Sequence, residues 1–199
     1  MKPSEHAADP FVRRARAEGW RSRAVFKLEE IDRRERLLKP RQVCVDLGAS
    51  PGAWSQYAKR KVGRGGRVVA ADLLPIEPIP GVEFVLGDFR EEAVLETIVA
   101  MLPEGQADVV LSDMAPALSG IDAIDQPRSM YLAELALDLA ERVLKGDGAA
   151  LIKTFQGAGF QELVRTARQR FAKVKLVKPG ASRARSPELY LLAKQRVLV

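Results

Sequence analysis

A short apolar run leads directly into a glycine-rich turn at residues 43–58, which read VCVDLGASPGAWSQYA. The run 43–47 is typical of a buried strand, and the segment after the turn, AWSQYAKRKV, is typical of a helix. Two kinds of site share this strand–turn–helix unit. The stretch GASPG matches the G-x-S-x-G nucleophile elbow of serine hydrolases, and it is also similar to a glycine-rich loop that holds a nucleotide. Neighbouring residues must distinguish the two.

The alternation of strands with helices continues along the whole chain. Further strand-like apolar runs lie at 67–72, 82–88, 107–113, 149–155, 172–178 and 188–197. Helical patterns lie at 22–38, 91–102, 127–145 and 159–171. This alternation predicts an α/β fold, a Rossmann-like, doubly wound sheet of seven mostly parallel strands with helices on both faces. Because only the turn-like stretch 179–187 separates the last two strands, we expect the last strand to be antiparallel.

Length and composition fit one domain. At 199 residues with 47% hydrophobic residues, the chain can bury a sizeable core, and we expect residues 21–199 to form a single domain after a basic, mobile tail at 1–20. No apolar run approaches the ~20 residues of a membrane span, and the N-terminus lacks the apolar segment of a secretory signal. With one cysteine and one histidine, no His/Cys zinc site is possible, so we expect no metal. The lone cysteine favours a reduced, cytoplasmic setting.

Charge is distributed unevenly along the chain. Residues 1–41 carry 12 Lys/Arg against 7 Asp/Glu, whereas residues 42–162 carry 10 against 18. Residues 163–187 carry 8 basic residues and no acid. One basic segment alone is readily explained by solvated helix faces, but two that flank an acidic middle favour a polyanionic partner.

The hydrolase interpretation fails on two physical grounds. The oxyanion hole of a nucleophile elbow uses the backbone N–H of the residue after the nucleophile, and here that residue is Pro51, which has none. A catalytic triad also needs a histidine, and the only one is His6, far upstream in the expected tail. A Ser–Lys variant would be the one remaining form of hydrolase.

With the hydrolase interpretation disfavoured, the second interpretation is a loop that holds a nucleoside. The residues of this loop favour a cationic ligand. A strict dinucleotide fingerprint would place glycines at 48, 50 and 53, but the chain has Gly48, Ser50, Gly52 and Ala53. Asp46 at the mouth of this loop would repel a pyrophosphate. It would suit S-adenosylmethionine, which carries an ammonium and a sulfonium group and no phosphate.

Further acidic residues follow the next strands. Asp72 ends the second strand, where an acid typically binds ribose hydroxyls, and Asp88 ends the third, where it could accept from an adenine amino group. Trp54 could pack near the ligand. A single aspartate at a strand end is more often a helix N-cap. Four at successive strand ends, counting Asp46 and Asp113, are difficult to explain in that way.

Four charged residues form a candidate reaction centre. Lys153 lies in the apolar strand LIKTF, where an unpaired charge would be costly to bury. Asp113 ends the neighbouring strand, Lys27 projects from the first helix, and Glu188 opens the last strand. A structural salt bridge would also explain Lys153 taken alone.

At this point the chain resembles a known family. SRAVFKLEEID, VDLGASPGAWSQY, ADLLPI, GVEFVLGDFR, VVLSDMAP, IKTFQGAGF and SRARSPELY together resemble the RrmJ/FtsJ family of ribosomal RNA large-subunit 2′-O-methyltransferases. The resemblance runs from about residue 10 to the C-terminus. It implies a methyltransferase fold, S-adenosylmethionine as methyl donor, and a uridine in the A-loop of large-subunit rRNA, within the assembled subunit, as substrate. We expect a cytoplasmic monomer with no membrane partner.

The resemblance also implies roles for particular residues. It places a catalytic tetrad on Lys27, Asp113, Lys153 and Glu188. It places cofactor contacts on Gly52, Trp54, Asp72, Asp88 and Asp113, to which the loop residues Asp46 and Gly48 are added. From the basic segments, we predict RNA contacts for Arg21, Arg23, Arg183 and Arg185. Two residues depart from the family pattern, since Ser50 stands in place of alanine and Ala117 in place of asparagine.

The tetrad predicts the chemistry but leaves the substrate and the proton acceptor open. Lys153 can act as a base only when neutral, and otherwise it can orient a ribose hydroxyl and stabilise the developing negative charge. A related 2′-O-methyltransferase that acts on tRNA or on an mRNA cap would use the same four residues. A non-catalytic RNA-binding assembly factor is a further alternative, and the complete tetrad argues against it.

Overall fold

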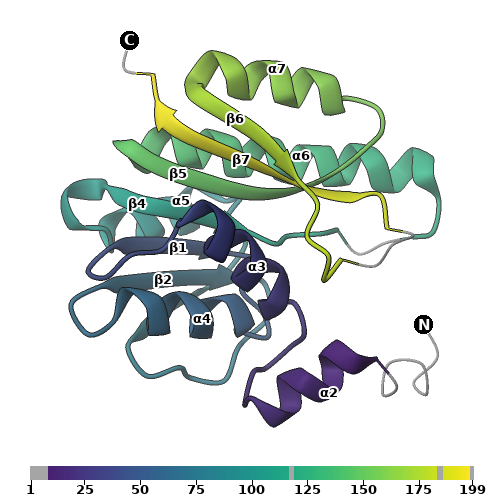
Figure 1. Ribbon diagram of the computed structural model, residues 1–199. Coiled ribbons are helices and arrows are strands. Elements are labelled where there is room, and N and C mark those ends of the chain that lie inside the picture. The colour runs from purple at the N-terminus through teal and green to yellow at the C-terminus, as the bar shows by residue number, and fades with distance from the viewer. Residues whose placement is uncertain (1–8, 117–118, 183–185, 198–199) are drawn as a thin grey trace.

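One sheet of seven strands organises the computed structural model, which describes residues 9–116, 119–182 and 186–197 (Figure 1). The strand order is β3-β2-β1-β4-β5-β7-β6. The strands are β1 (Val43–Leu47), β2 (Arg67–Asp72), β3 (Val82–Leu86), β4 (Ala107–Ser112), β5 (Leu144–Phe155), β6 (Phe171–Val177) and β7 (Glu188–Arg196). The helices are α2 (Pro10–Ala17), α3 (Val25–Glu35), α4 (Ala53–Val62), α5 (Glu92–Ala100), the short 3₁₀ turn η1 (Pro103–Gly105), α6 (Asp122–Val143) and α7 (Phe160–Arg170).

The pairing of the strands confirms the predicted fold class. β1, β2, β3, β4 and β5 pair in parallel, whereas β7 lies antiparallel between β5 and β6. The order of the strands reverses between β1 and β4, because successive units are added on opposite sides of β1. In open α/β sheets, ligands bind outside the carboxyl ends of the strands at such a reversal.

Helices cover both faces of the sheet and bury separate apolar clusters against it. On one face, α6 and α7 contribute fully buried residues such as Leu137 and Leu163. On the other face, α3 and α4 contribute Leu28, Ile31 and Tyr57. Burying a side chain of this size stabilises the fold by about 1.5–3 kcal/mol. These two clusters fix the strand ends that carry the candidate site residues.

The N-terminal boundary differs from the prediction. Residues 10–17, which were expected to belong to a mobile tail, form helix α2, in which Val12 and Ala15 are buried. The carboxylate of Asp9 accepts a hydrogen bond from the N–H of Phe11 at 2.9 Å and so caps this helix. The packed part of the chain therefore begins about ten residues before residue 21, because α2 buries apolar side chains against the domain.

The longest helix also begins earlier than predicted. The helical pattern predicted a start at residue 127, but α6 starts at Asp122 and carries Pro127 inside its second turn. The carboxylate of Asp125 accepts hydrogen bonds from the N–H groups of Ser119 and Gly120, both at 2.9 Å, which organises the entry to the helix. Among the described helices, none is both long and apolar enough to cross a membrane.

Candidate active site

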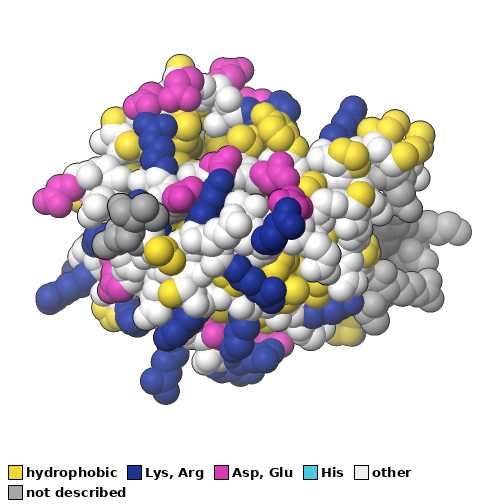
Figure 2. Space-filling model, turned by 90° about the horizontal axis from the view of Figure 1, so that it is seen from above, with side chains coloured by type: hydrophobic (Ala, Val, Ile, Leu, Met, Phe, Trp, Pro, Cys, Tyr) yellow, Lys and Arg dark blue, Asp and Glu magenta, His cyan; other side chains and the backbone are white. Residues whose placement is uncertain are grey.

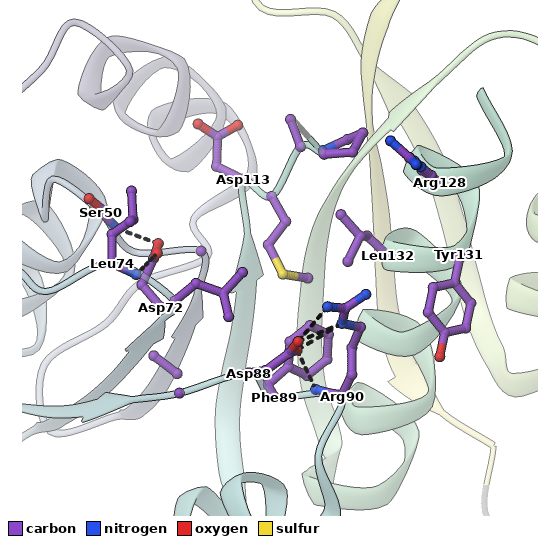
Figure 3. Close-up of a pocket in the computed structure, with 17 residues that line it drawn as sticks. Ser50, Asp72, Leu74, Asp88, Phe89, Arg90, Asp113, Arg128, Tyr131 and Leu132 are labelled. Atoms are coloured by element: carbon purple, nitrogen blue, oxygen red, sulfur yellow. Dashed lines mark hydrogen bonds and ion pairs between the residues drawn. The ribbon is translucent and has the colours of Figure 1, made fainter. Parts of the chain in front are cut away.

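A cavity of about 780 Å³ opens at the carboxyl ends of β1 to β4, at the point where the strand order reverses (Figure 3). Three of the acidic residues predicted from strand ends line it. The cavity is lined by Gly48, Ser50, Ala71, Asp72, Leu73, Leu74, Gly87, Asp88, Phe89, Arg90, Asp113, Met114, Ala115, Pro116, Arg128, Tyr131 and Leu132. The cavity thus combines an apolar lining with a few acidic groups, as small-molecule sites generally do.

The loop between β1 and α4 forms one wall of the cavity. Gly48 has a φ of 73°, and a Cβ atom there would lie 2.5 Å from Cγ of Met114, so only glycine fits. The N–H of Ser50 donates to one oxygen of Asp72 and the N–H of Leu74 donates to the other, both at 2.8 Å. These two bonds hold the Asp72 carboxylate at the end of β2, where it was expected to meet a ribose.

Asp88 carries a partner that the sequence did not predict. Arg90 Nε donates to both oxygens of the Asp88 carboxylate at 2.8 Å, as Figure 3 shows. Hydrogen bonding by Arg90 holds the pKa of Asp88 below its usual value, against the opposing effect of burial. An adenine amino group could share this carboxylate only beside Arg90 or after displacing it.

Asp46 lies beneath the cavity and not on its wall. It is fully buried, and one of its oxygens accepts a hydrogen bond from Ser55 Oγ at 2.5 Å. The other oxygen, Oδ1, has no partner among the described residues. Burial, together with the nearby carboxylates of Asp113 and Asp72, raises the pKa of Asp46 to about 7, although the hydrogen bond from Ser55 opposes the shift. A buried acid in this state would be stabilised by a positive charge placed above it.

Gly52 and the Trp54 ring lie outside the residues that line the cavity. Gly52 begins α4 with a φ of 105°, and a Cβ there would lie 2.9 Å from Nη1 of Arg21. The Trp54 indole is buried at 3% exposure, and its Nε1 donates to the carbonyl of Ala24 at 2.8 Å. The Trp54 ring belongs to the core between α3 and α4, and its contact with a ligand stays a prediction.

The four tetrad residues are brought together from four separate elements. Lys27 Nζ on α3 lies 2.7 Å from Oε1 of Glu188 at the start of β7. Lys153 Nζ on β5 lies 3.6 Å from Oε2 of Glu188 and 3.2 Å from Oδ1 of Asp113 at the end of β4. The result is a continuous chain of alternating charge. All four side chains are 8–16% exposed, so water screens these contacts only weakly.

Two hydroxyl groups complete the cluster. Ser182 Oγ donates to Oε1 of Glu188 at 2.8 Å, and the hydroxyl of Tyr190 donates to Oδ1 of Asp113 at 2.6 Å. Burial acts to raise the pKa of Glu188, but the Lys27 and Lys153 ammonium groups outweigh it and hold that pKa below its usual value. Burial raises the pKa of the Tyr190 phenol, so this group stays protonated and remains a donor. The sequence carried one signal for Tyr190, since it follows Glu188 at the i+2 spacing of a strand.

The Arg21 side chain donates hydrogen bonds to backbone carbonyls of the protein itself. Its Nη1 donates to the carbonyl of Glu77 at 2.6 Å and to that of Pro51 at 3.1 Å. These bonds join the segment before α3 to the loops that follow β1 and β2. A structural role of this kind was not visible in the sequence, because the acceptors are backbone carbonyls 30 and 56 residues away.

The Arg23 side chain also contacts other groups of the protein. Its guanidinium forms an ion pair with Asp9 and donates to the carbonyl of Ala181, and its side chain is 15% exposed. The proposed RNA contacts of Arg21 and Arg23 therefore use donors that already have protein partners. Arg183 and Arg185 lie outside the described residues.

The basic surface is partly neutralised by acids from other elements. Within the acid-free segment 163–187, Lys175 pairs with Glu35 at 2.7 Å and Arg170 pairs with Asp138 at 2.5 Å. Figure 2, which views the molecule from above, shows Lys and Arg side chains mixed with acidic ones, and basic side chains predominate along the lower edge of that view. The described residues also contain no group of three or more His, Cys, Asp or Glu that could hold a metal ion.

Comparison with known proteins agrees with the geometry. The strand order with an antiparallel β7, together with the cavity at the β1–β4 reversal, defines the class of Rossmann-like methyltransferases. A model of the family described as FtsJ-like methyltransferase matches residues 20–196, and the chain belongs to this family.

Curated relatives and solved structures support the same assignment. The chain is 60% identical over 190 residues to "Ribosomal RNA large subunit methyltransferase E" from Stenotrophomonas maltophilia, covering 96% of this chain and 90% of that one. It is 57% identical over 190 residues to the protein of the same name from Legionella pneumophila, covering 96% and 92%. A crystal structure from Plasmodium falciparum, described as a ribosomal RNA methyltransferase, is 25% identical with a TM-score of 0.73, covering 89% and 98%.

Proposed function

We propose that this protein transfers a methyl group from S-adenosylmethionine to the ribose 2′-hydroxyl of a uridine in large-subunit ribosomal RNA. The observation that carries the proposal is the position of Asp113, which lines the cavity and also ends the Lys27–Glu188–Lys153–Asp113 chain. One residue thereby joins a nucleoside site to a charged reaction centre. The proposal includes a monomeric enzyme acting in the cytoplasm.

The cavity residues fit the methyl donor. S-adenosylmethionine, when bound, supplies a methyl group on a positively charged sulfur. Asp72 would hold the ribose and Asp88 the adenine amino group, while the glycine-rich loop from Gly48 would approach the amino-acid end. The unpartnered buried oxygen of Asp46 favours a cationic ligand above it. A pyrophosphate would meet repulsion from the same carboxylates.

The tetrad residues would hold the acceptor hydroxyl. Lys153 Nζ is fixed between Asp113 and Glu188, so its position relative to the cavity is set before the RNA binds. In the proposed role it donates to the 2′-oxygen and stabilises the negative charge that develops there while the sulfur–methyl bond breaks, the oxygen–methyl bond forms and the hydroxyl proton passes to solvent. Lys27 holds the Glu188 carboxylate through both of its oxygens. Fixing the hydroxyl in line with the methyl group would itself supply a large part of the acceleration.

The substrate assignment rests on similarity. Relatives that are 57–60% identical across nearly the whole chain are named as large-subunit rRNA methyltransferases, and the motifs resemble those of the 2′-O-specific family. The proposed substrate is therefore an A-loop uridine within the assembled large subunit. The tetrad by itself would serve tRNA or an mRNA cap equally well.

Methyl transfer to several RNAs in parallel tests the proposal. Purified protein would be given labelled S-adenosylmethionine with large subunits, naked rRNA, tRNA or capped RNA. We expect label in the large subunit, none with Lys153→Ala, and normal transfer with Lys145→Ala, a lysine at the other end of β5 that pairs with Asp108. Label mainly in tRNA or capped RNA would show that one of these, and not large-subunit rRNA, is the substrate. RNA binding without any methylated product would favour the non-catalytic alternative.

A further inference from the structure

We propose that Ser182 and Arg23 are positioning residues for Glu188, and that helix α2 reaches the reaction centre through them. The inference rests on the proposed methyltransferase function and deepens it. It gives Arg23 a role different from the RNA contact that the sequence suggested. The contacts that support it run from Asp9 through Arg23 and Ala181 to Ser182 and Glu188.

The first step is the orientation of the Glu188 carboxylate. Its Oε1 accepts from Ser182 Oγ at 2.8 Å, and Lys27 Nζ lies 2.7 Å from Oε1 and 2.8 Å from Oε2. Oε2 is also 3.6 Å from Lys153 Nζ, so the Ser182 hydroxyl is the contact that distinguishes the two oxygens. Ser182 is itself buried at 8% exposure, so water does not readily replace its hydroxyl. Loss of this donor would free the carboxylate to rotate about its contact with Lys27. The distance between Oε2 and Lys153 would then no longer be fixed.

The second step is the anchoring of the turn that carries Ser182. The N–H of Ser182 donates to the carbonyl of Pro179 at 3.0 Å, which closes the turn. The neighbouring Ala181 accepts from the Arg23 guanidinium through its carbonyl, and its N–H donates to Glu30 on α3 at 3.4 Å. The turn is therefore held from α3 and from the segment just before it. The sequence separation between Arg23 and Ala181 is 158 residues.

The third step joins α2 to this turn. The Asp9 carboxylate pairs with Arg23 through one oxygen and caps α2 at the Phe11 N–H through the other. The Arg23 guanidinium also lies 5.1 Å from the centre of the Phe11 ring. Because the arginine fork bonds a carboxylate and a carbonyl at once, a lysine could not replace both contacts. Displacement of α2 would thus shift Arg23 and, through it, the turn that carries Ala181 and Ser182.

Three variants and one matched control separate the chain of contacts from general stability. Ser182→Ala removes only the hydroxyl that faces Glu188. The matched control is Ser129→Ala, since Ser129 is equally buried at 8% exposure and donates to a backbone carbonyl. Asp9→Asn keeps a good helix cap but removes the charge that faces Arg23. Arg23→Lys keeps the charge and loses the fork.

We expect Ser182→Ala to lower the single-turnover rate about tenfold and Asp9→Asn about threefold, with unchanged RNA affinity. Ser129→Ala should retain the wild-type rate. Full activity of Ser182→Ala would overturn the role of Ser182. If Asp9→Asn instead strengthens RNA binding and raises its salt dependence at an unchanged rate, Arg23 is a phosphate contact and not a positioning residue.

A readout that needs no RNA separates this inference from the proposed function. Carboxyl-carbon NMR of Glu188 follows its titration, and the Ser182 hydroxyl is one of the groups that hold the pKa of Glu188 low. Ser182→Ala should raise that pKa, while Ser129→Ala should not. An unchanged pKa of Glu188 in Ser182→Ala would contradict the positioning role, whether or not any RNA is methylated. Absence of methylation by the wild-type protein would contradict only the proposed function.

Discussion

Replacing Asp46 by asparagine should stabilise the protein in a pH-dependent way. Asp46 is fully buried at the end of β1, with one oxygen bonded to Ser55 and the other without a partner. Asparagine keeps the shape and can still accept from Ser55, but it cannot ionise. The variant therefore removes the cost of burying a charge next to Asp72 and Asp113.

The size of the effect follows from the raised pKa. Burial moves the pKa of Asp46 from 3.8 to about 7, so the folded state favours the protonated form. Stability from this group is fully present below pH 3.8 and is lost as the pH rises through about 7. The full shift corresponds to about 4 kcal/mol, of which about 2–3 kcal/mol falls between pH ~5 and pH ~8.

Urea unfolding at pH ~5 and pH ~8 measures this difference directly. The free energy of unfolding of Asp46→Asn relative to wild type should increase by about 2–3 kcal/mol from the lower to the higher pH. Any fixed cost of the buried amide cancels in this comparison. Asp147→Asn, at an exposed position, serves as the control and should show no such change. A difference that does not vary with pH would refute the assignment of Asp46 as a destabilised buried acid.

Further outcomes concern the ligand, the reaction and the RNA. Wild-type affinity for S-adenosylmethionine should rise with pH through about 7, while that of Asp46→Asn should not; calorimetry over this range checks it. Asp72→Ala should weaken the same binding by removing the ribose acceptor, and tight binding of NAD in the titration would contradict the site. Lys153→Ala should abolish single-turnover transfer at nearly unchanged donor affinity, and a wild-type rate would remove it from the mechanism. The Arg183→Ala/Arg185→Ala double variant should reduce the log–log salt slope of RNA binding by roughly 0.7 per lost contact, and an unchanged slope would end the RNA assignment of this turn.

The parts of the fold that the sequence predicted well are those with strong local signals. β1 and β2 begin and end as predicted, because an apolar run and a following glycine or aspartate mark the end of each. The antiparallel β7 followed from the short connection after β6. The start of α6 was predicted five residues too late, because Pro127 is tolerated within the helix and the Asp125 carboxylate binds the N–H groups that precede it.

In the site, too, features with a local sequence signal were predictable, whereas contacts between residues far apart in the sequence were not. The proximity of Lys27, Asp113, Lys153 and Glu188 was predictable, because each lies near a strand end or on one helix face and the family resemblance groups them. The buried Trp54 ring was also signalled, since Trp54, Tyr57 and Ala58 have the i, i+3, i+4 spacing of a core-facing helix. The partners of Arg21 and Arg23 were not predictable, because an arginine that bonds distant carbonyls looks the same in sequence as one that meets phosphate.

The position of the transferred methyl group tests the central claim most directly. Large subunits treated with the protein and labelled S-adenosylmethionine would be digested to nucleosides and analysed by mass spectrometry, with Lys153→Ala in parallel. The account predicts labelled 2′-O-methyluridine with the wild-type protein and none with the variant. A methyl group on a base, or equal amounts of 2′-O-methyluridine with Lys153→Ala, would contradict the proposed reaction centre.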